Sequence, residues 1–118
     1  YVIEARVLET VPSTADVKRK AAPARVERFD LEELKLPLFV RGRRTGDKFV
    51  PLGMTAEKKV GKFLTSQKVP ESIRRQVLVI EDAEKIVWLW PIRMSEQAKV
   101  TSTTTKVLEL RITDSRSQ

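Results

Sequence analysis

Residues 77–92 have the sequence VLVIEDAEKIVWLWPI, in which two apolar runs are separated by a polar segment. Both runs are rich in the β-branched and aromatic residues that favour strands. The polar residues 81–85 between them predict a turn. We therefore expect an antiparallel β-hairpin, with Trp88 and Trp90 on one face of its second strand and in the hydrophobic core. An alternative role for the two tryptophans is stacking on an exposed RNA base.

Upstream of this hairpin the apolar residues change to a helical spacing. A helix is predicted over 56–67, with Thr55 as its N-cap and one apolar face formed by Val60, Phe63 and Leu64. A second short helix is predicted over 71–76, because Pro70 suits the first position of a helix. The two helices come directly before the hairpin, so we expect them to pack against its sheet.

Further strands are predicted from the pattern of apolar and β-branched residues. They cover residues 1–11, 36–43 and 100–112, and an extended segment is expected over 49–53. Between them we predict a polar loop over 13–28, a helical turn over 29–34 capped by Asp30, and a tight turn at 45–47. This order predicts an α+β fold, a mostly antiparallel β-sheet or sandwich with two short helices packed on one side.

The composition excludes several kinds of catalytic site. The chain has 118 residues and neither Cys nor His, so zinc sites built on those residues, thiol nucleophiles and Ser-His-Asp triads cannot form within it. A metal site or an acid–base pair made of carboxylates alone stays open. The sequence has no Gly-rich phosphate loop, and its paired carboxylates fall at predicted turns. We predict neither a catalytic residue nor a metal site.

The positive charge is concentrated in one part of the chain. Residues 38–76 hold ten Lys or Arg and three acids, and this excess of +7 equals the net charge of the whole protein. A basic segment interleaved with apolar residues predicts a folded surface that binds a polyanion. The separate cluster Lys18-Arg19-Lys20 lacks aromatic and glycine neighbours and is interpreted as part of a solvated loop.

Ten basic residues are candidates for contact with RNA phosphates, since Arg and Lys bind phosphate oxygens. They are Arg41, Arg43, Arg44, Lys48, Lys58, Lys59, Lys62, Arg74, Arg75 and Arg93. The alternatives are protection of a strand edge for the arginines and a solvated helix face for the lysines. Asp47 is expected to be structural, either capping backbone N–H groups or pairing with an arginine.

A series of motifs resembles a known family. It begins with FDLEELKLPL at 29–38 and RTGDKFVPLGM at 44–54, with Val40-Arg41 between them. It continues with KKV at 58–60, FL at 63–64, KVP at 68–70, Arg74, IVW at 86–88, RMSE at 93–96, KVT at 99–101 and TKVL at 105–108. The ordered series resembles the C-terminal domain of tRNA(Ile)-lysidine synthetase over about residues 29–112. The chain departs from the family pattern at Ala56, Leu78 and Pro91.

The resemblance implies a function for the whole enzyme and a narrower one for this chain. The enzyme uses ATP and Mg²⁺, bound in an N-terminal domain, to attach lysine to the first anticodon cytidine of an isoleucine tRNA with a CAU anticodon. The SGGxDS-type phosphate loop of that domain is absent from this sequence. The resemblance therefore implies a non-catalytic part of a cytoplasmic ligase, without a cofactor of its own, that grips the acceptor stem of tRNA. A homodimer of the parent stays open.

Because the chain starts at Tyr1 without an initiator Met, we expect a fragment of a longer protein. The predicted organisation is a connecting strand and loop over 1–28, the tRNA-binding domain over 29–112 and a frayed tail over 113–118. Two other functions stay open, a general basic RNA-binding module and a non-catalytic structural or dimerisation domain.

Overall fold

The computed structural model describes residues 1–9 and 26–114. The chain divides into two compact units, unit 1 from Tyr1–Leu34 and Ala98–Gln118, and unit 2 from Lys35–Gln97. The Lys18-Arg19-Lys20 cluster and the last four residues lie outside the described residues. The predicted boundaries at 28/29 and 112/113 stay a prediction. No described helix is long and apolar enough to cross a membrane.

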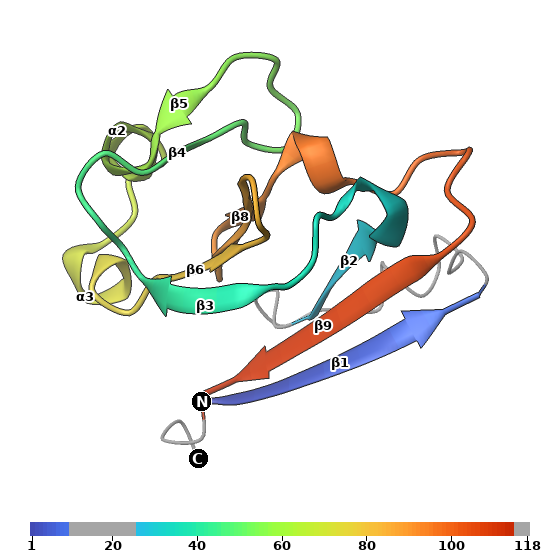
Figure 1. Ribbon diagram of the computed structural model, residues 1–118. Coiled ribbons are helices and arrows are strands. Elements are labelled where there is room, and N and C mark those ends of the chain that lie inside the picture. The colour runs from blue at the N-terminus through green and yellow to red at the C-terminus, as the bar shows by residue number, and fades with distance from the viewer. Residues whose placement is uncertain (10–25, 115–118) are drawn as a thin grey trace. The chain divides into compact units, whose positions relative to one another are not determined.

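Unit 1 is a three-stranded antiparallel sheet in the order β1-β9-β2, in which β1 (Val2–Leu8) lies along β9 (Val107–Thr113) (Figure 1). The third strand is β2 (Val26–Asp30), so the prediction of a loop over 13–28 is wrong for its last three residues. Val26 and Phe29 are buried where β2 pairs with β9, which explains why this polar segment forms a strand.

The helical turn predicted over 29–34 is confirmed for Leu31–Glu33, while residues 29 and 30 belong to β2, and the long C-terminal strand is shorter than predicted. The 3₁₀ helix η1 (Leu31–Glu33) is capped by Asp30, whose Oδ1 accepts a hydrogen bond from the Glu32 N–H at 3.1 Å. The strand predicted over 100–112 begins only at Val107, after η2 (Glu96–Ala98) and a turn. In that turn the Thr104 hydroxyl accepts a hydrogen bond from the Thr101 N–H at 2.8 Å. Threonine side chains often bind nearby backbone groups in this way, which takes those groups away from pairing with a strand.

Unit 2 contains the predicted hairpin within a four-stranded antiparallel sheet. Its order is β3 (Phe39–Gly42), β6 (Leu78–Glu81), β7 (Ile86–Trp90) and β8 (Arg93–Met94). Trp88 and Trp90 are 1% and 4% exposed, which confirms that they are core residues. β3 is shorter than the predicted 36–43 because it pairs only with the four residues of β6.

The hairpin turn is held by Asp82, whose side chain is fully buried. Its Oδ1 accepts from the N–H groups of Glu84 and Lys85 at 2.7 and 2.8 Å. Its Oδ2 accepts from the Lys35 N–H at 2.9 Å and from the Lys85 ammonium at 2.8 Å. Burial alone would raise the pKa of Asp82, but these hydrogen bonds outweigh it and lower the pKa below its ordinary value.

The rest of unit 2 packs on one apolar cluster. Helices α2 (Val60–Ser66) and α3 (Glu71–Arg74) lie at the same end of the unit, at the left of Figure 1. The buried face of α2 packs with residues of β4 (Lys48–Phe49), β6 and β7, in a cluster of Phe49, Val60, Phe63, Leu64, Val77, Val79, Ile86 and Leu89. Within the described residues, three antiparallel sheets and two short α-helices confirm the α+β prediction.

Both helices are shorter than predicted. α2 starts at Val60 with Lys59 as its N-cap, so Thr55 does not cap it. The reason is that β5 (Lys58–Lys59) pairs with Lys48–Phe49 of β4, a contact between residues about ten positions apart that a local helical pattern does not reveal. α3 ends two residues before the predicted Gln76, and Pro70 is its N-cap.

Candidate nucleic-acid interface

The turn between β3 and β4 is held by an ion cluster, which we call the Arg41 cluster (Arg41, Asp47 and Glu81). The Arg41 guanidinium donates to Asp47 Oδ1 and Oδ2 at 2.9 and 3.1 Å, and to Glu81 Oε1 and Oε2 at 2.9 and 3.2 Å. It also donates to the Gly42 carbonyl at 3.0 Å. These bonds engage all five N–H donors of the guanidinium. Its side chain is only 15% exposed.

The cluster favours the charged form of both Arg41 and Asp47. Hydrogen bonds to Asp47 and Glu81 raise the pKa of Arg41 above its ordinary value. Burial alone would raise the pKa of Asp47, but the hydrogen bonds from Arg41 and from the Arg44 backbone lower it below its ordinary value. Both groups are therefore charged at neutral pH, and the Arg–carboxylate pairing with Asp47 is bidentate.

Asp47 also connects the turn to the start of α2. Its Oδ2 accepts from the Arg44 N–H at 2.7 Å, and its own N–H donates to the Arg44 carbonyl at 3.2 Å. Its carbonyl oxygen accepts from the Val60 N–H at 2.9 Å. Gly46 has a φ of +92°, which a glycine adopts without strain. The sequence predicted that Asp47 is structural, either by capping backbone N–H groups or by pairing with an arginine, and in the structure it does both.

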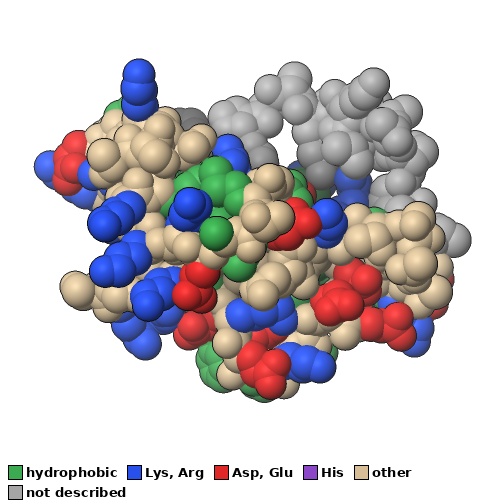
Figure 2. Space-filling view, turned by 90° about the horizontal axis from the view of Figure 1, so that it is seen from above, with side chains coloured by type: hydrophobic (Ala, Val, Ile, Leu, Met, Phe, Trp, Pro, Cys, Tyr) green, Lys and Arg blue, Asp and Glu red, His purple; other side chains and the backbone are tan. Residues whose placement is uncertain are grey.

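Beside this turn lies a hollow of about 670 Å³, which we call the basic hollow. Four of its lining side chains are cationic and three carry hydroxyl groups. The lining residues are Arg43, Arg44, Thr45, Gly46, Asp47, Lys59, Gly61, Lys62, Thr65 and Ser66. Figure 2 shows Lys and Arg side chains gathered at the left of the molecule, the side on which α2 and β5 lie in Figure 1. Cations, hydroxyls and exposed backbone at glycine are the groups that bind phosphate oxygens.

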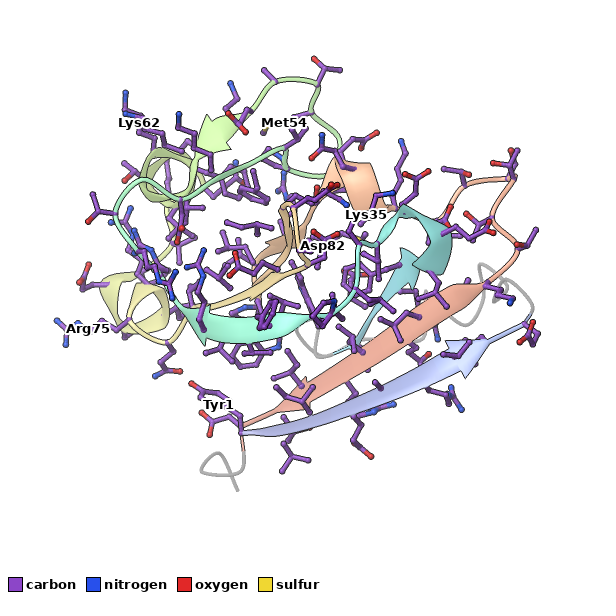
Figure 3. All side chains as sticks on the ribbon, viewed as in Figure 1. Tyr1, Lys35, Met54, Lys62, Arg75 and Asp82 are labelled. Atoms are coloured by element: carbon purple, nitrogen blue, oxygen red, sulfur yellow. The ribbon has the colours of Figure 1, made fainter. Side chains whose placement is uncertain are left out.

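The strand pair that borders the hollow places like charges opposite each other. Lys48 of β4 is the direct partner of Lys59 of β5 in the antiparallel register. Like charges in this position repel each other and destabilise the pair. A second hollow of about 510 Å³ shares Lys59, Lys62 and Ser66 with the first and adds Met54, Glu57, Lys58 and Phe63. Lys62 and Met54 border the same upper region of unit 2 in Figure 3. A bound polyanion would relieve the repulsion between the lysines.

The family model described as the TilS substrate C-terminal domain matches residues 38–112 of this chain. The chain belongs to this family. The match confirms the resemblance seen in the sequence, and it includes every residue of the Arg41 cluster and of the basic hollow.

Curated relatives of this TilS C-terminal domain share its sequence over a similar length. The tRNA(Ile)-lysidine synthase of Geobacter sulfurreducens is 38% identical over 84 residues, which are 71% of this chain and 18% of that protein. The tRNA(Ile)-lysidine synthase of Caldanaerobacter subterraneus is 38% identical over 85 residues, 72% of this chain and 18% of that protein. The chain thus spans about a fifth of the length of the curated relatives it matches.

Solved structures show the same fold. A crystal structure of a TilS C-terminal domain superposes with a TM-score of 0.71 and 26% identity, covering 92% of this chain and 80% of that chain. An N-terminal fragment of the phenylalanyl-tRNA synthetase β-subunit from Pyrococcus horikoshii has a TM-score of 0.71 and 17% identity. It covers 92% of this chain and 38% of that chain, and at this identity the likeness concerns the fold alone.

The structure divides the ten predicted contact residues of this TilS C-terminal domain into groups. Arg43, Arg44, Lys59 and Lys62 line the basic hollow, Lys58 lines the second hollow, and Lys48 faces Lys59. Arg41 does not line either hollow, and its donors are engaged by the Arg41 cluster. A phosphate contact by Arg41 would therefore require its guanidinium to break an internal hydrogen bond.

The last three predicted residues lie outside both hollows. Arg74 donates to the hydroxyl of Thr65, which lines the basic hollow. Arg75 is exposed, extends outward from α3 in Figure 3, and pairs with Glu71 at 3.5 Å. The Arg93 guanidinium lies 5.1 Å from the centre of the Phe63 ring and donates to Gln67 at 3.1 Å. Arg74 therefore contacts the lining of the basic hollow through Thr65, whereas Arg75 and Arg93 bind residues that do not line it.

Sequence reasoning missed the hydroxyl groups of the basic hollow. Thr65 and Ser66 follow Lys62 by three and four residues, so helical spacing alone could have placed them on the same face. It also missed Gly61, where an added Cβ would lie 3.5 Å from the Arg43 guanidinium. The sequence around Glu81 does not indicate its ion pair with Arg41, because that pair depends on the pairing of β3 with β6.

Proposed function

We propose that this TilS C-terminal domain binds tRNA, and that the basic hollow holds phosphates of the acceptor stem. The rest of the parent ligase, which is a cytoplasmic enzyme in this proposal, uses ATP to attach lysine to the anticodon cytidine. The observation that carries the proposal is the clustering of four cationic side chains around a hollow whose carboxylate, Asp47, is already paired with Arg41. The printed name of the relatives, tRNA(Ile)-lysidine synthase, supports tRNA as the substrate class.

The chemistry of the hollow favours recognition of the RNA backbone. Arg43 and Arg44 can each offer two parallel N–H donors to a phosphate, and Lys59 and Lys62 add point charges. The Thr45 hydroxyl can donate to a phosphate oxygen. The Thr65 and Ser66 hydroxyls donate to the Gly61 and Phe63 carbonyls at 3.1 and 2.8 Å, so they can accept from a 2′-OH group. Duplex RNA is recognised in this way, by shape and backbone and not by base sequence in its deep groove.

Charge reversal in the hollow tests the proposal. Lys59→Glu should weaken binding of an acceptor-stem minihelix to the 118-residue chain by roughly tenfold or more at low salt, because it removes a phosphate contact and adds a repulsion. The matched control is Lys106→Glu, which reverses an exposed lysine of unit 1 and changes the net charge equally. Fluorescence anisotropy measures both. Equal affinities of the two variants would contradict the role of the basic hollow.

Competition distinguishes acceptor-stem binding from general RNA binding. A minihelix with the tRNA acceptor stem should displace labelled tRNA better than an unrelated RNA duplex of the same length. Equal competition would support the alternative of a general basic RNA-binding module. Absence of tRNA binding at low salt would leave a structural domain as the function.

A further inference from the structure

Asp47 is a carboxylate inside a surface suited to anions. Among the residues that line the basic hollow it is the single acid, and the other charged residues there are Arg43, Arg44, Lys59 and Lys62. A carboxylate free to rotate among four cations would pair with them and compete with a phosphate for the same donors. The hollow therefore stays available to a ligand only if Asp47 is held elsewhere.

Arg41 provides that restraint. Its guanidinium binds both Asp47 oxygens, at 2.9 and 3.1 Å, and Arg41 is itself anchored to Glu81 by two further hydrogen bonds. The Asp47 side chain is 9% exposed. Arg41 is not a lining residue, so the pair removes the negative charge of Asp47 from competition without using a cation of the hollow.

The same pairing fixes the two walls of the basic hollow. One wall is the turn with Arg43 and Arg44, which Asp47 holds through the Arg44 N–H. The other is the start of α2, which Asp47 holds through its carbonyl oxygen and the Val60 N–H. Misplacing Asp47 would move both walls, because these bonds share one residue.

We propose that Arg41 is a positioning residue for anion binding, which holds Asp47 in the turn and keeps it from neutralising the cations of the basic hollow. This inference rests on the proposed function. It assigns Arg41, whose side chain is only 15% exposed, a role through Asp47 and not through contact with the ligand.

The test compares two arginines of equal side-chain exposure. Arg41→Met and Arg28→Met each remove one positive charge, and both native side chains are 15% exposed and paired with carboxylates. In the acceptor-stem titration, Arg41→Met should lose roughly tenfold or more in affinity, the size expected when a charged contact is lost. Arg28→Met, in unit 1, should lose about twofold or less, the effect of net charge alone.

A rescue separates positioning from a purely structural role. Asp47→Asn added to Arg41→Met removes the competing negative charge and restores the native net charge. The double variant should regain several-fold in affinity over Arg41→Met, whereas a structural role predicts no gain or a further loss. If circular dichroism shows that Arg41→Met is unfolded, Arg41→Lys is used in its place. The lysine ammonium has three donors, so it cannot make the four hydrogen bonds by which Arg41 holds Asp47 and Glu81.

Each outcome decides one question. Arg41→Met binding as well as Arg28→Met, or a double variant binding no better than the single one, overturns the positioning role. The wild-type chain and Lys59→Glu are measured in the same titration. If these two bind equally, or neither binds, the proposed function fails independently of the role of Arg41.

Discussion

Each unit of the molecule contains a three-membered ion cluster, and the two clusters have opposite composition. In unit 2 one arginine is bound by two carboxylates, Asp47 and Glu81. In unit 1 one carboxylate, Glu109, is bound by Arg6 and Arg28 at 2.8 and 2.9 Å. We call the latter the Glu109 cluster. The basic half of the chain thus contains the cluster with the negative excess.

The two clusters also differ in what they connect. Arg6 and Arg28 are the direct cross-strand partners of Glu109 on β9, so the Glu109 cluster stays within one sheet. The Arg41 cluster joins β3, the turn after it and the diagonal position on β6. The first arrangement stabilises strand pairing. The second fixes the loop that borders the basic hollow to the sheet of unit 2.

The largest predicted effect is a difference between the clusters in the free energy of unfolding that is lost when an arginine is replaced. Arg41→Met leaves two carboxylates without their shared partner and should lower the free energy of unfolding by about 3–5 kcal/mol. Arg28→Met should cost about 1–2 kcal/mol, because Glu109 keeps its bond to Arg6. Urea unfolding followed by tryptophan fluorescence measures both. Equal losses would show that the number of carboxylates left behind does not matter.

When a carboxylate is removed in place of an arginine, the larger loss of stability should occur in the Glu109 cluster. Glu109→Gln should lower the free energy of unfolding by about 1–3 kcal/mol, because the 7%-exposed acid holds two arginines. Glu81→Gln should cost about 0.5–1 kcal/mol, since Glu81 is more exposed and Arg41 keeps Asp47. The same urea titrations apply. A larger loss for Glu81→Gln than for Glu109→Gln would contradict the prediction that Glu109 stabilises its cluster more than Glu81 does.

Acid should weaken unit 2 through its two aspartates with lowered pKa. A folded pKa below the ordinary 3.8 means that Asp47 and Asp82 contribute stability above that value. The contribution is lost as the pH falls through their folded pKa. Thermal unfolding across this range should show a smaller fall in Tm for Asp47→Asn than for the wild type. An unchanged pH dependence of Tm in this variant would show that Asp47 does not contribute to the loss of stability in acid.

The smallest effect concerns the end of α2 and touches neither cluster. Lys68 has a φ of +56°, and it follows a helix end in which the Lys68 and Val69 N–H groups donate to Thr65 and Leu64 carbonyls. Glycine is preferred at this position. Lys68→Gly should raise the free energy of unfolding by about 0.5–1 kcal/mol. Lys62→Gly, inside the helix, is the control and should lower it by a similar amount.

Local patterns predicted the elements that depend on neighbouring residues. The apolar runs of 77–92 gave the hairpin and its buried tryptophans, and Asp30 gave the cap of η1. The start of α2 was predicted wrongly because β5 depends on a distant strand. The strand over 26–30 was missed because it is polar and becomes a strand only beside β9.

The sequence predicted where in the chain the candidate site lies, but not what each of its residues does. Charge density predicted a candidate interface within 38–76, and four of the ten predicted residues line the basic hollow. Arg41 and Arg43 have equivalent positions in an alternating strand pattern, but β3 ends at Gly42. Arg43 therefore leaves the sheet while Arg41 stays in it beside Glu81, a difference that depends on tertiary structure.

The facing lysines of β4 and β5 give added salt opposite effects on their strand pair and on the proposed RNA binding. Counterions screen the repulsion between Lys48 and Lys59, so this strand pair is destabilised less as ionic strength rises. In the proposed function the same counterions compete with RNA, whose affinity falls with salt by a slope of about −0.7 to −0.9 per phosphate neutralised. The ionic conditions that ease the β4–β5 pair are consequently those in which the proposed RNA binding is weakest.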